Sequence, residues 1–449
     1  MANRPFCIMS LLRCLAPVLL SLALLPAAHA QRCNDEGNAP VQPAAAVDAA
    51  EADPRVQLQN LVSLALSRSK QVGAAYLLKL SADADVEEAK AQHQPTVVVG
   101  ATLGHVGTIV NGLTTERGIL GRGTVTASVP VFDFGRIDKL TEWRKQLSDA
   151  ARFGQSNAEE QVALQTVSLA LDRSRYTLQA QVYGQFVKRM ACLVEALDII
   201  TKADKGRASE YVQAQKSLQQ AQLSLDQTTS TIKQIDVRLA RFVGDALPPP
   251  AGMSSVLAQL PPLADLEADV LLAADVAQAT ASAKAQHSYT ESVLAGQKPS
   301  VSVQVSGDQS FHAVRQTDWS GGIAVNIPIL QPGADATLTS ALRRAQAADL
   351  QRDDTIEGKR YRVREMYESA SSAMDRAKSI VDILRNSDRV RASTLQQWQQ
   401  LGRRSLFDVM GAEGDYYSMR IAHVNALFDA EQVVAMMWSQ GRGVMTPLR

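Results

Sequence analysis

Four short segments of alternating apolar and polar residues, set between long helical stretches, restrict most strongly how this chain can fold. In 96–105 and 124–131 every second residue is apolar, which is the period of a β-strand with two unlike faces. The pattern returns in 301–306 and 322–329. The segment between the first two, 106–123, carries several glycines, which predict a hairpin loop there. We therefore predict two hairpins, with strands of about nine residues.

Helical periodicity occupies most of the remaining chain. Apolar residues recur at every third or fourth position through 137–205, a stretch far beyond the roughly 8–20 residues of most helices. At 1.5 Å per residue such a helix would approach about 100 Å. The predicted helices cover 58–93, 137–205, 210–243, 263–295, 334–400 and 406–440.

The two halves of the chain carry the same pattern. Matching residues are 198 positions apart in the sequence. They are Pro130 and Pro328, Gly135 and Gly333, Glu210 and Asp408, and Ala214 and Ala412. A shared register of this kind predicts an internal duplication of a helix–strand–strand–helix–turn–helix unit.

The N-terminus has the pattern of an export signal. Arg4 and Arg13 precede an apolar run, Leu15–Leu25, that is too short for a bilayer span, and small residues follow up to Ala30. We predict cleavage after Ala30. The predicted organisation is a signal peptide 1–30, a disordered leader 31–55, a first repeat 56–244, a Pro-rich linker 245–262, a second repeat 263–442 and a tail 443–449.

Composition and charge exclude several classes of protein. Lysine plus arginine and aspartate plus glutamate both number 46, so there is no basic excess to bind nucleic acid. The histidines lack metal-ligand spacing, and no nucleophile lies beside a base in a known pattern. We therefore predict no enzyme activity, no metal and no cofactor.

The alternating segments predict a sheet in contact with lipid. Their apolar face is nearly all valine and isoleucine, and their other face is small and polar. A soluble sheet is the alternative. In a membrane the sheet must close, because lipid cannot satisfy open edges, and four strands are fewer than the roughly eight of the smallest membrane barrels. Closure therefore requires several copies, and geometry leaves two or three open.

Three sequence segments resemble TolC-like outer-membrane channel proteins, also described as outer membrane efflux proteins. VPVFDFGR at 129–136 is similar to their strand-to-helix junction, and KPSVS at 298–302 to the entry of their third strand. GRRSLFDVMGAE at 402–413 is similar to their helical turn at the periplasmic tip. The resemblance extends over about 55–442.

The resemblance implies an α+β, mostly α fold. A long α-helical barrel would join a transmembrane β-barrel built from four strands of each protomer of a homotrimer. It implies a passive exit duct in the outer membrane that extends into the periplasm and serves tripartite efflux or type I secretion. The partners would be a periplasmic adaptor and an ABC or RND inner-membrane transporter. The alternative is a secreted or periplasmic structural coiled-coil protein without channel activity.

The resemblance also assigns candidate residues at the tip. Asp408 matches a family position that forms an acidic ring, where three carboxylates around one axis would favour cations. Arg404 matches an arginine that holds the tip closed. The alternative for both is a solvated turn charge. The predicted aperture residues are Asp408, Arg404, Arg403 and Glu413.

Two further groups of residues have predicted structural roles. Gly206 and Gly402 are expected at positive φ, where the helices reverse. The tip turns, with a second role in adaptor docking, comprise Gly206, Arg207, Ser209, Glu210, Gly402 and Ser405. The strand–helix junctions comprise Pro130, Asp133, Gly135, Pro328 and Gly333.

Overall fold

The computed structural model describes 53–110, 113–249, 253, 256–257, 259–311, 315–401 and 404–448. The predicted signal peptide and nearly all of the predicted leader lie outside these residues, as do Gly402 and Arg403. The chain forms two compact units, which we describe separately. The helical unit consists of Met1–Asn60, Ser168–Ala258 and Ala370–Gln432, and the sheet unit of Leu61–Val167, Gln259–Ser369 and Val433–Arg449. Each unit draws on both predicted repeats.

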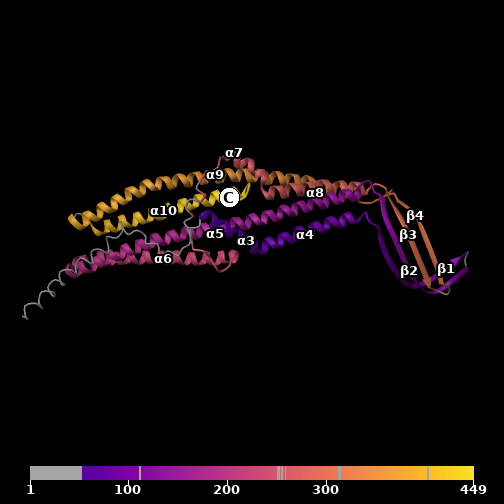
Figure 1. Ribbon diagram of the computed structural model, residues 1–449, viewed down its shortest axis with the longest axis horizontal. Coiled ribbons are helices and arrows are strands. Elements are labelled where there is room, and N and C mark those ends of the chain that lie inside the picture. Colours follow the sequence, from indigo (N-terminus) through magenta and orange to yellow (C-terminus); the bar gives the residue numbers. More distant parts are fainter. Residues whose placement is uncertain are drawn as a thin grey trace, which may run out of the picture. The chain divides into compact units, whose positions relative to one another are not determined.

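Helices dominate the secondary structure (Figure 1). None of the helices in the described ranges is both long and apolar enough to cross a bilayer. The helices are α3 (Pro54–Arg68), α4 (Lys70–Ala91), α5 (Arg136–Ala203), η1 (Lys205–Arg207), α6 (Ala208–Val243), α7 (Leu263–Asp269), η2 (Val270–Leu272), α8 (Ala274–Gly296), α9 (Ala334–Leu401), α10 (Leu406–Ser439) and η3 (Thr446–Leu448).

The helix bounds repeat with the register seen in the sequence. Helices α5 and α9 both have 68 residues, and both their first and their last residues are 198 positions apart. Helices α6 and α10 also begin 198 positions apart. Each of the two long predicted helices is therefore one continuous helix, and the first ends two residues before the predicted boundary at 205.

Two predicted helices are interrupted. The helix expected over 58–93 breaks at Ser69, which is extended (φ −67°, ψ 117°) and whose hydroxyl accepts a hydrogen bond from Val72 N, so that it caps α4. The helix expected over 263–295 breaks at Ala273, which is also extended. A serine that offers its side chain to a backbone N–H stabilises such a start within an otherwise helical pattern.

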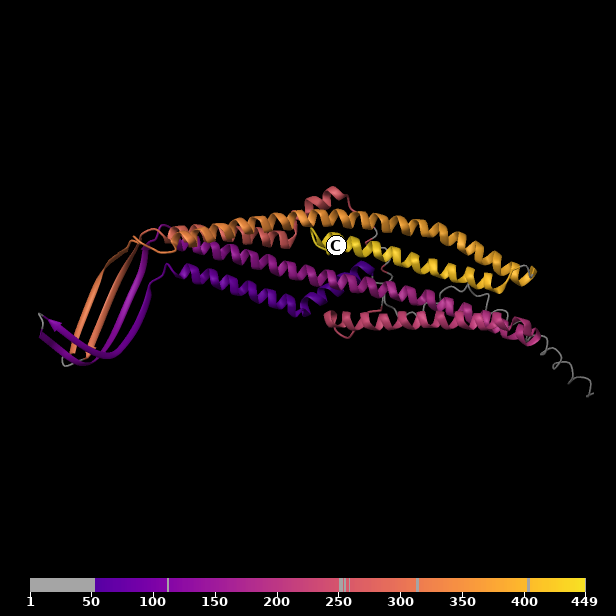
Figure 2. The same cartoon turned by 180° about the vertical axis from the view of Figure 1, so that it is seen from behind.

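All four strands form one antiparallel sheet in the order β1-β2-β3-β4 (Figures 1 and 2). The strands are β1 (Thr96–Val110), β2 (Leu113–Phe132), β3 (Ser300–Phe311) and β4 (Arg315–Asn326). The two hairpins join through β2 and β3, where Val129 pairs with Val303. Strands β1 and β4 are the edges of the sheet within the described chain.

The predicted loop between the first two strands is wrong. Strand β1 has 15 residues and β2 has 20. Their pairing continues through the glycines, with Gly107 opposite Arg117 and Gly121 opposite Leu103. Glycine retains the N–H and C=O groups that make the ladder, so a glycine-rich stretch extends the hairpin when its partner strand supplies matching groups.

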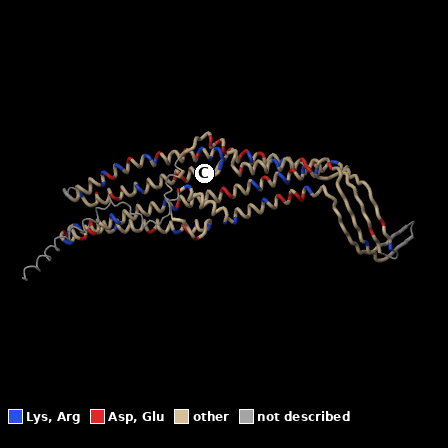
Figure 3. Tube along the Cα trace, in the orientation of Figure 1, with Lys and Arg blue, Asp and Glu red and all other residues tan. Residues whose placement is uncertain are grey.

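Apolar side chains of the sheet are exposed within the protomer. Val99, Leu103 and Ile323 are 76%, 81% and 73% exposed. The charged positions that are coloured on the strands in Figure 3 lie toward the hairpin ends, and 124–132, 300–307 and 319–326 contain no Lys, Arg, Asp or Glu. The helices of the described chain therefore leave this apolar surface uncovered.

A sharp turn joins the sheet to each long helix. Gly135 has φ 79° and Gly333 has φ 87°, which is the left-handed conformation that favours glycine. Asp133 caps α5, because its carboxylate accepts hydrogen bonds from Gly135 N at 3.1 Å and Ile137 N at 2.9 Å. The two glycines therefore reverse the chain at equivalent places in the two halves.

Gly135→Ala and Gly333→Ala are expected to lower the free energy of unfolding by about 1–2 kcal/mol each. A Cβ atom at either position meets nothing within 4 Å, so the effect isolates backbone strain. Gly358→Ala is the control, because Gly358 lies in helix α9 with no atom within 4 Å of an added Cβ, and alanine should stabilise it by about 0.5–1 kcal/mol. Chemical denaturation of the purified protein measures all three, and equal effects at Gly135 and Gly358 would contradict the strain assignment.

Candidate functional site at the helical tip

The first turn of the helical unit joins α5 to α6 through η1. Asp204 caps it, with its Oδ1 accepting a hydrogen bond from Gly206 N at 3.0 Å. The prediction of a positive φ for Gly206 is wrong, because Gly206 is not among the residues with positive φ. Its place in the turn has a different reason, since an added Cβ would lie 3.1 Å from Asp204 Oδ1. The chain reverses through a capped 3-10 turn.

The second turn carries the candidate gate. Ser405 Oγ accepts a hydrogen bond from Asp408 N, and Asp408 Oδ2 accepts one from Ser405 N, both at 3.2 Å. This reciprocal pair is a capping box at the start of α10. Arg404 Nη1 lies 3.8 Å from the same Oδ2. Asp408 is thus held by its own helix, with its side chain 46% exposed.

The two turns share a hydrophobic core. Leu197 of α5 and Ala214 of α6 are fully buried, and they belong to one cluster with Leu406 and Met410 of α10. Tyr211 and Trp398 pack against this cluster. The core fixes the start of α10, and with it Asp408, against the α5–α6 hairpin, since close-packed interiors resist small displacements.

The structure places Glu413 away from the surface on which Asp408 lies. The Glu413 side chain is 0% exposed. Its Oε1 accepts a hydrogen bond from Arg189 Nε at 2.8 Å, and its Oε2 lies 3.6 Å from Arg391 Nη1. Glu413 therefore joins α5, α9 and α10 inside the protomer, instead of adding a charge to an aperture.

Aromatic side chains extend this buried ion cluster. The Arg391 guanidinium lies 4.3 Å from the ring centroid of Tyr416, and the rings of Phe186 and Tyr417 are 4.9 Å apart. Cation–π and aromatic contacts of this kind add directional stabilisation to apolar burial. Arg189 and Arg391 had no sequence signal, because their common partner lies on a third helix.

The remaining tip residues lie at the first turn. Arg207 is 3.8 Å from Asp204 and 3.9 Å from Glu210, measured between charged atoms. Ser209 is exposed. Among the described contacts, none links Glu210 to Asp408, so the equivalent positions of the two halves do not meet within one protomer.

A second buried carboxyl lies in the helical unit. Glu431 of α10 is 2% exposed. Neither of its oxygens makes a hydrogen bond of good geometry among the described residues. Burial raises the pKa of Glu431 to about 8, although the nearby backbone of Val256 lowers it slightly. Glu431 is therefore protonated over much of the range in which ordinary carboxyls are ionised.

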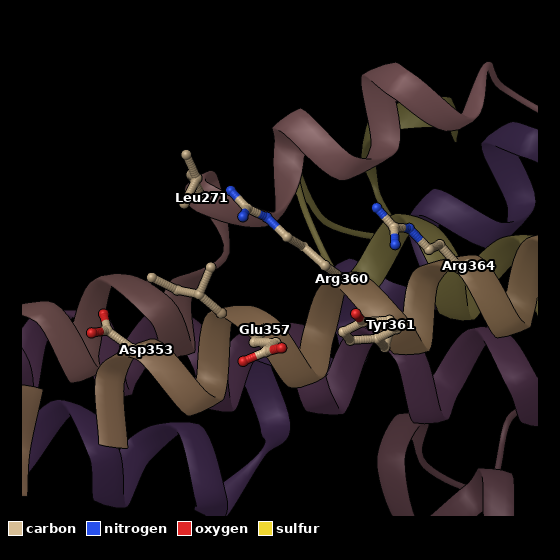
Figure 4. Close-up of a pocket in the computed structure, with 7 residues that line it drawn as sticks. Leu271, Asp353, Glu357, Arg360, Tyr361 and Arg364 are labelled. Carbon is tan, nitrogen blue, oxygen red and sulfur yellow. The ribbon is translucent and has the colours of Figure 1, made fainter. Parts of the chain in front are cut away.

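The sheet unit has an open hollow of about 500 Å³ between η2 and α9. Figure 4 shows Arg360 projecting from α9 toward Leu271, with Arg364, Asp353 and Glu357 along the same helix. The Arg364 guanidinium donates hydrogen bonds to both carboxylate oxygens of Glu267, from Nε to Oε1 at 2.5 Å and from Nη2 to Oε2 at 3.3 Å. Charges of both signs line the hollow, so it selects no class of ligand. In the described part of the chain, no three His, Cys, Asp or Glu residues are placed to hold a metal ion.

Glu413→Gln is expected to lower the free energy of unfolding by about 3 kcal/mol, because it removes the buried negative charge that lies between the largely buried side chains of Arg189 and Arg391. Asp388→Asn is the matched control, since Asp388 contacts the same Arg391 at 2.9 Å but is 53% exposed, and its loss should cost under about 1 kcal/mol. Urea denaturation followed by circular dichroism compares them. Losses of equal size would show that burial of the cluster contributes nothing.

Glu431 predicts a pH dependence of stability. The folded-state pKa is raised above the ordinary value of 4.5, so the contribution is fully present below pH 4.5 and is lost as pH rises toward 8. The loss across this window is about 4 kcal/mol. Glu431→Gln should flatten the dependence and stabilise the protein at pH 8. Thermal melts between pH 5 and 8 test this, and parallel curves for the two proteins would contradict it.

Comparison with known proteins matches part of the chain to a family model. Residues 61–245 match the family model described as outer membrane efflux protein. None of the curated proteins matches the sequence.

Several solved structures share the fold. VceC from Vibrio cholerae is 17% identical with a TM-score of 0.73, over 86% of this chain and 97% of that protein. The open state of MtrE from Neisseria gonorrhoeae is 17% identical with a TM-score of 0.70, over 87% and 91%. CusC is 16% identical with a TM-score of 0.72, over 88% and 92%.

At these identities the likeness establishes the fold alone, and the family match rests on residues 61–245. Helices that flank a small antiparallel sheet are common to this chain and to these outer-membrane channels. The resemblance of this chain to the TolC-like outer membrane efflux protein family, which its sequence predicted, is therefore confirmed.

Proposed function

We propose that the chain is one subunit of a trimeric outer-membrane channel-tunnel, which serves as the passive exit duct of a tripartite efflux or type I secretion system. An inner-membrane transporter of the ABC or RND type would supply the energy, and a periplasmic adaptor would connect it to the duct. The long helices would extend into the periplasm. The solved structures that share this fold include outer membrane channels, which supports the proposed class.

The open sheet carries this proposal. Strands β1 and β4 are edges among the described strands, and the valine-rich surface between them is exposed. Unpaired backbone groups cost several kcal/mol each in lipid. Three copies would supply twelve strands and pair every edge in a closed barrel.

The tip supports a selective aperture. Asp408 is half-exposed at the first turn of α10, with its backbone fixed by the Ser405 capping box. Three such carboxylates around one axis would concentrate negative potential and favour cations. The contact of Arg404 with Asp408 at 3.8 Å offers an ionic restraint on the same turn.

The two tip turns are the proposed docking surface for the adaptor. The residues we assign to it are Gly206, Arg207, Ser209, Glu210 and Ser405, with Gly402 from outside the described residues. Asp204 and Ser405 cap the two turns, so the turns would present a fixed backbone to a partner.

Asp408→Asn is expected to reduce the cation-to-anion permeability ratio by about sevenfold, because a change of one kT in local potential alters the cation and anion populations by about 2.7-fold each in opposite directions. Asparagine keeps an oxygen for Ser405 N, so the capping box survives. Asp382→Asn is the control, because Asp382 is an exposed residue of α9 paired with Arg385. Single-channel recordings in planar bilayers measure the ratio for the purified, processed protein.

The recordings separate the parts of the proposal. Conductance that is unchanged in Asp408→Asn would keep the duct and remove Asp408 from the aperture. A water-soluble monomer without conductance would contradict the channel and favour a structural coiled-coil protein.

A further inference from the structure

A polar pocket lies in the sheet unit where the strands meet the helices. Its volume is about 250 Å³, and its polar lining comprises Asp133, Arg136, Lys298, Ser300, Asn326 and Gln331. The end of α8 packs against the Arg136 side chain, since a Cβ added at Gly296 would lie 3.6 Å from Arg136 Cδ. Strands and helices from both halves of the chain thus build one pocket.

The pocket has an excess of positive charge. Its one carboxylate, Asp133, is occupied by Gly135 N and Ile137 N and is only 11% exposed. Arg136 Nε lies 3.8 Å from that carboxylate. Lys298 has no ion pair among the described residues, and its ammonium lies 5.5 Å from the ring centroid of Phe134. An exposed, unneutralised ammonium therefore remains beside neutral hydrogen-bonding groups.

Exposed apolar side chains flank the pocket. Ile329 and Leu330 are 93% and 87% exposed on the segment that follows Pro328, which itself lines the pocket. We call the whole set the apolar collar, and it consists of Val131, Phe132, Phe134, Ile327, Ile329 and Leu330. An apolar surface of this kind beside a cation is typical of contact with a lipid headgroup region.

The geometry points to a phospholipid site at this junction, in which Lys298 and Arg136 bind the phosphate and the apolar collar contacts the acyl chains. This inference rests on the proposed function, because the sheet must enter a membrane for lipid to reach the pocket. The combination of charges determines the class of ligand. The phosphodiester anion of a phospholipid complements two cations, and the acyl chains of the same lipid cover the collar. A free small anion would leave the collar in water.

The test measures equilibrium binding of dioleoyl phosphatidylglycerol to the assembled protein in a neutral detergent at low salt, where screening is weak. Lys298→Gln is expected to weaken binding about fivefold, as for the loss of one cation near anionic lipid. Lys298→Arg should bind as the wild type does. Lys145→Gln is the control, because Lys145 is an exposed lysine of α5 outside the pocket.

Two further probes identify the source of the phosphate. Dioleoylglycerol lacks the phosphate, so its binding should not change in Lys298→Gln. Inorganic phosphate should not displace the phospholipid at equal concentration, and displacement would assign the pocket to a small anion.

A photo-crosslinker at Ile329 should label lipid, whereas labelling of a second protomer would place the collar in a subunit contact. Displacement by inorganic phosphate, labelling of a second protomer, or unchanged phospholipid binding in Lys298→Gln overturns the assignment.

Conductance separates this inference from the proposed function. Wild type and Lys298→Gln should conduct equally, because Lys298 is not in the proposed aperture. A conducting wild type whose phospholipid binding ignores Lys298→Gln would remove the lipid site alone. A wild type that neither enters bilayers nor conducts would remove the proposed function.

Discussion

The unpaired edges of the β1–β4 sheet are the constraint on which the proposed assembly depends. A strand edge presents a row of N–H and C=O groups that must find partners, and β1 and β4 find none among the described strands. The exposed valines between the edges add a second demand, because a contiguous apolar surface in water is unfavourable unless a partner or lipid covers it. Pairing with further copies in a lipid environment meets both demands at once.

The helical unit solves a different problem, which is to fix two turns against each other without a sheet. A shared apolar core holds the end of α5 and the starts of α6 and α10 together. The buried Glu413 with its two arginines then restricts which helix faces can meet, since a displaced carboxylate would lose its partners in a poorly solvating interior. Apolar burial is the dominant favourable term in folding, and the ion cluster adds a restriction on the register of the helices.

The sheet unit joins strands to helices at turns that require a backbone conformation unfavourable for most residues. Gly135 and Gly333 adopt positive φ at equivalent turns, and Asp133 satisfies the first N–H groups of α5. The strands therefore end abruptly and the helices begin at once. Cationic side chains and an exposed apolar collar gather at this junction as a consequence, which is why it is the place where a lipid site can form.

The sequence by itself determined the features that depend on local periodicity and on repetition. The long helices, the four strands and the register of 198 positions followed from the spacing of apolar residues, and the junction glycines followed from their repetition. The strand lengths did not follow, because glycine is a poor predictor of loops when a partner strand supplies the hydrogen bonds.

Tertiary structure alone decided how the polar residues are used. The sequence grouped Glu413 with Asp408, five positions away, yet Glu413 is buried against Arg189 and Arg391 and Asp408 is half-exposed in a capping box. It also gave no reason to connect Lys298 with Arg136, which share a pocket. The physical reason is the same in each case. Helical and strand periods specify which face a residue occupies, whereas the partner across that face comes from a distant segment that only packing brings near.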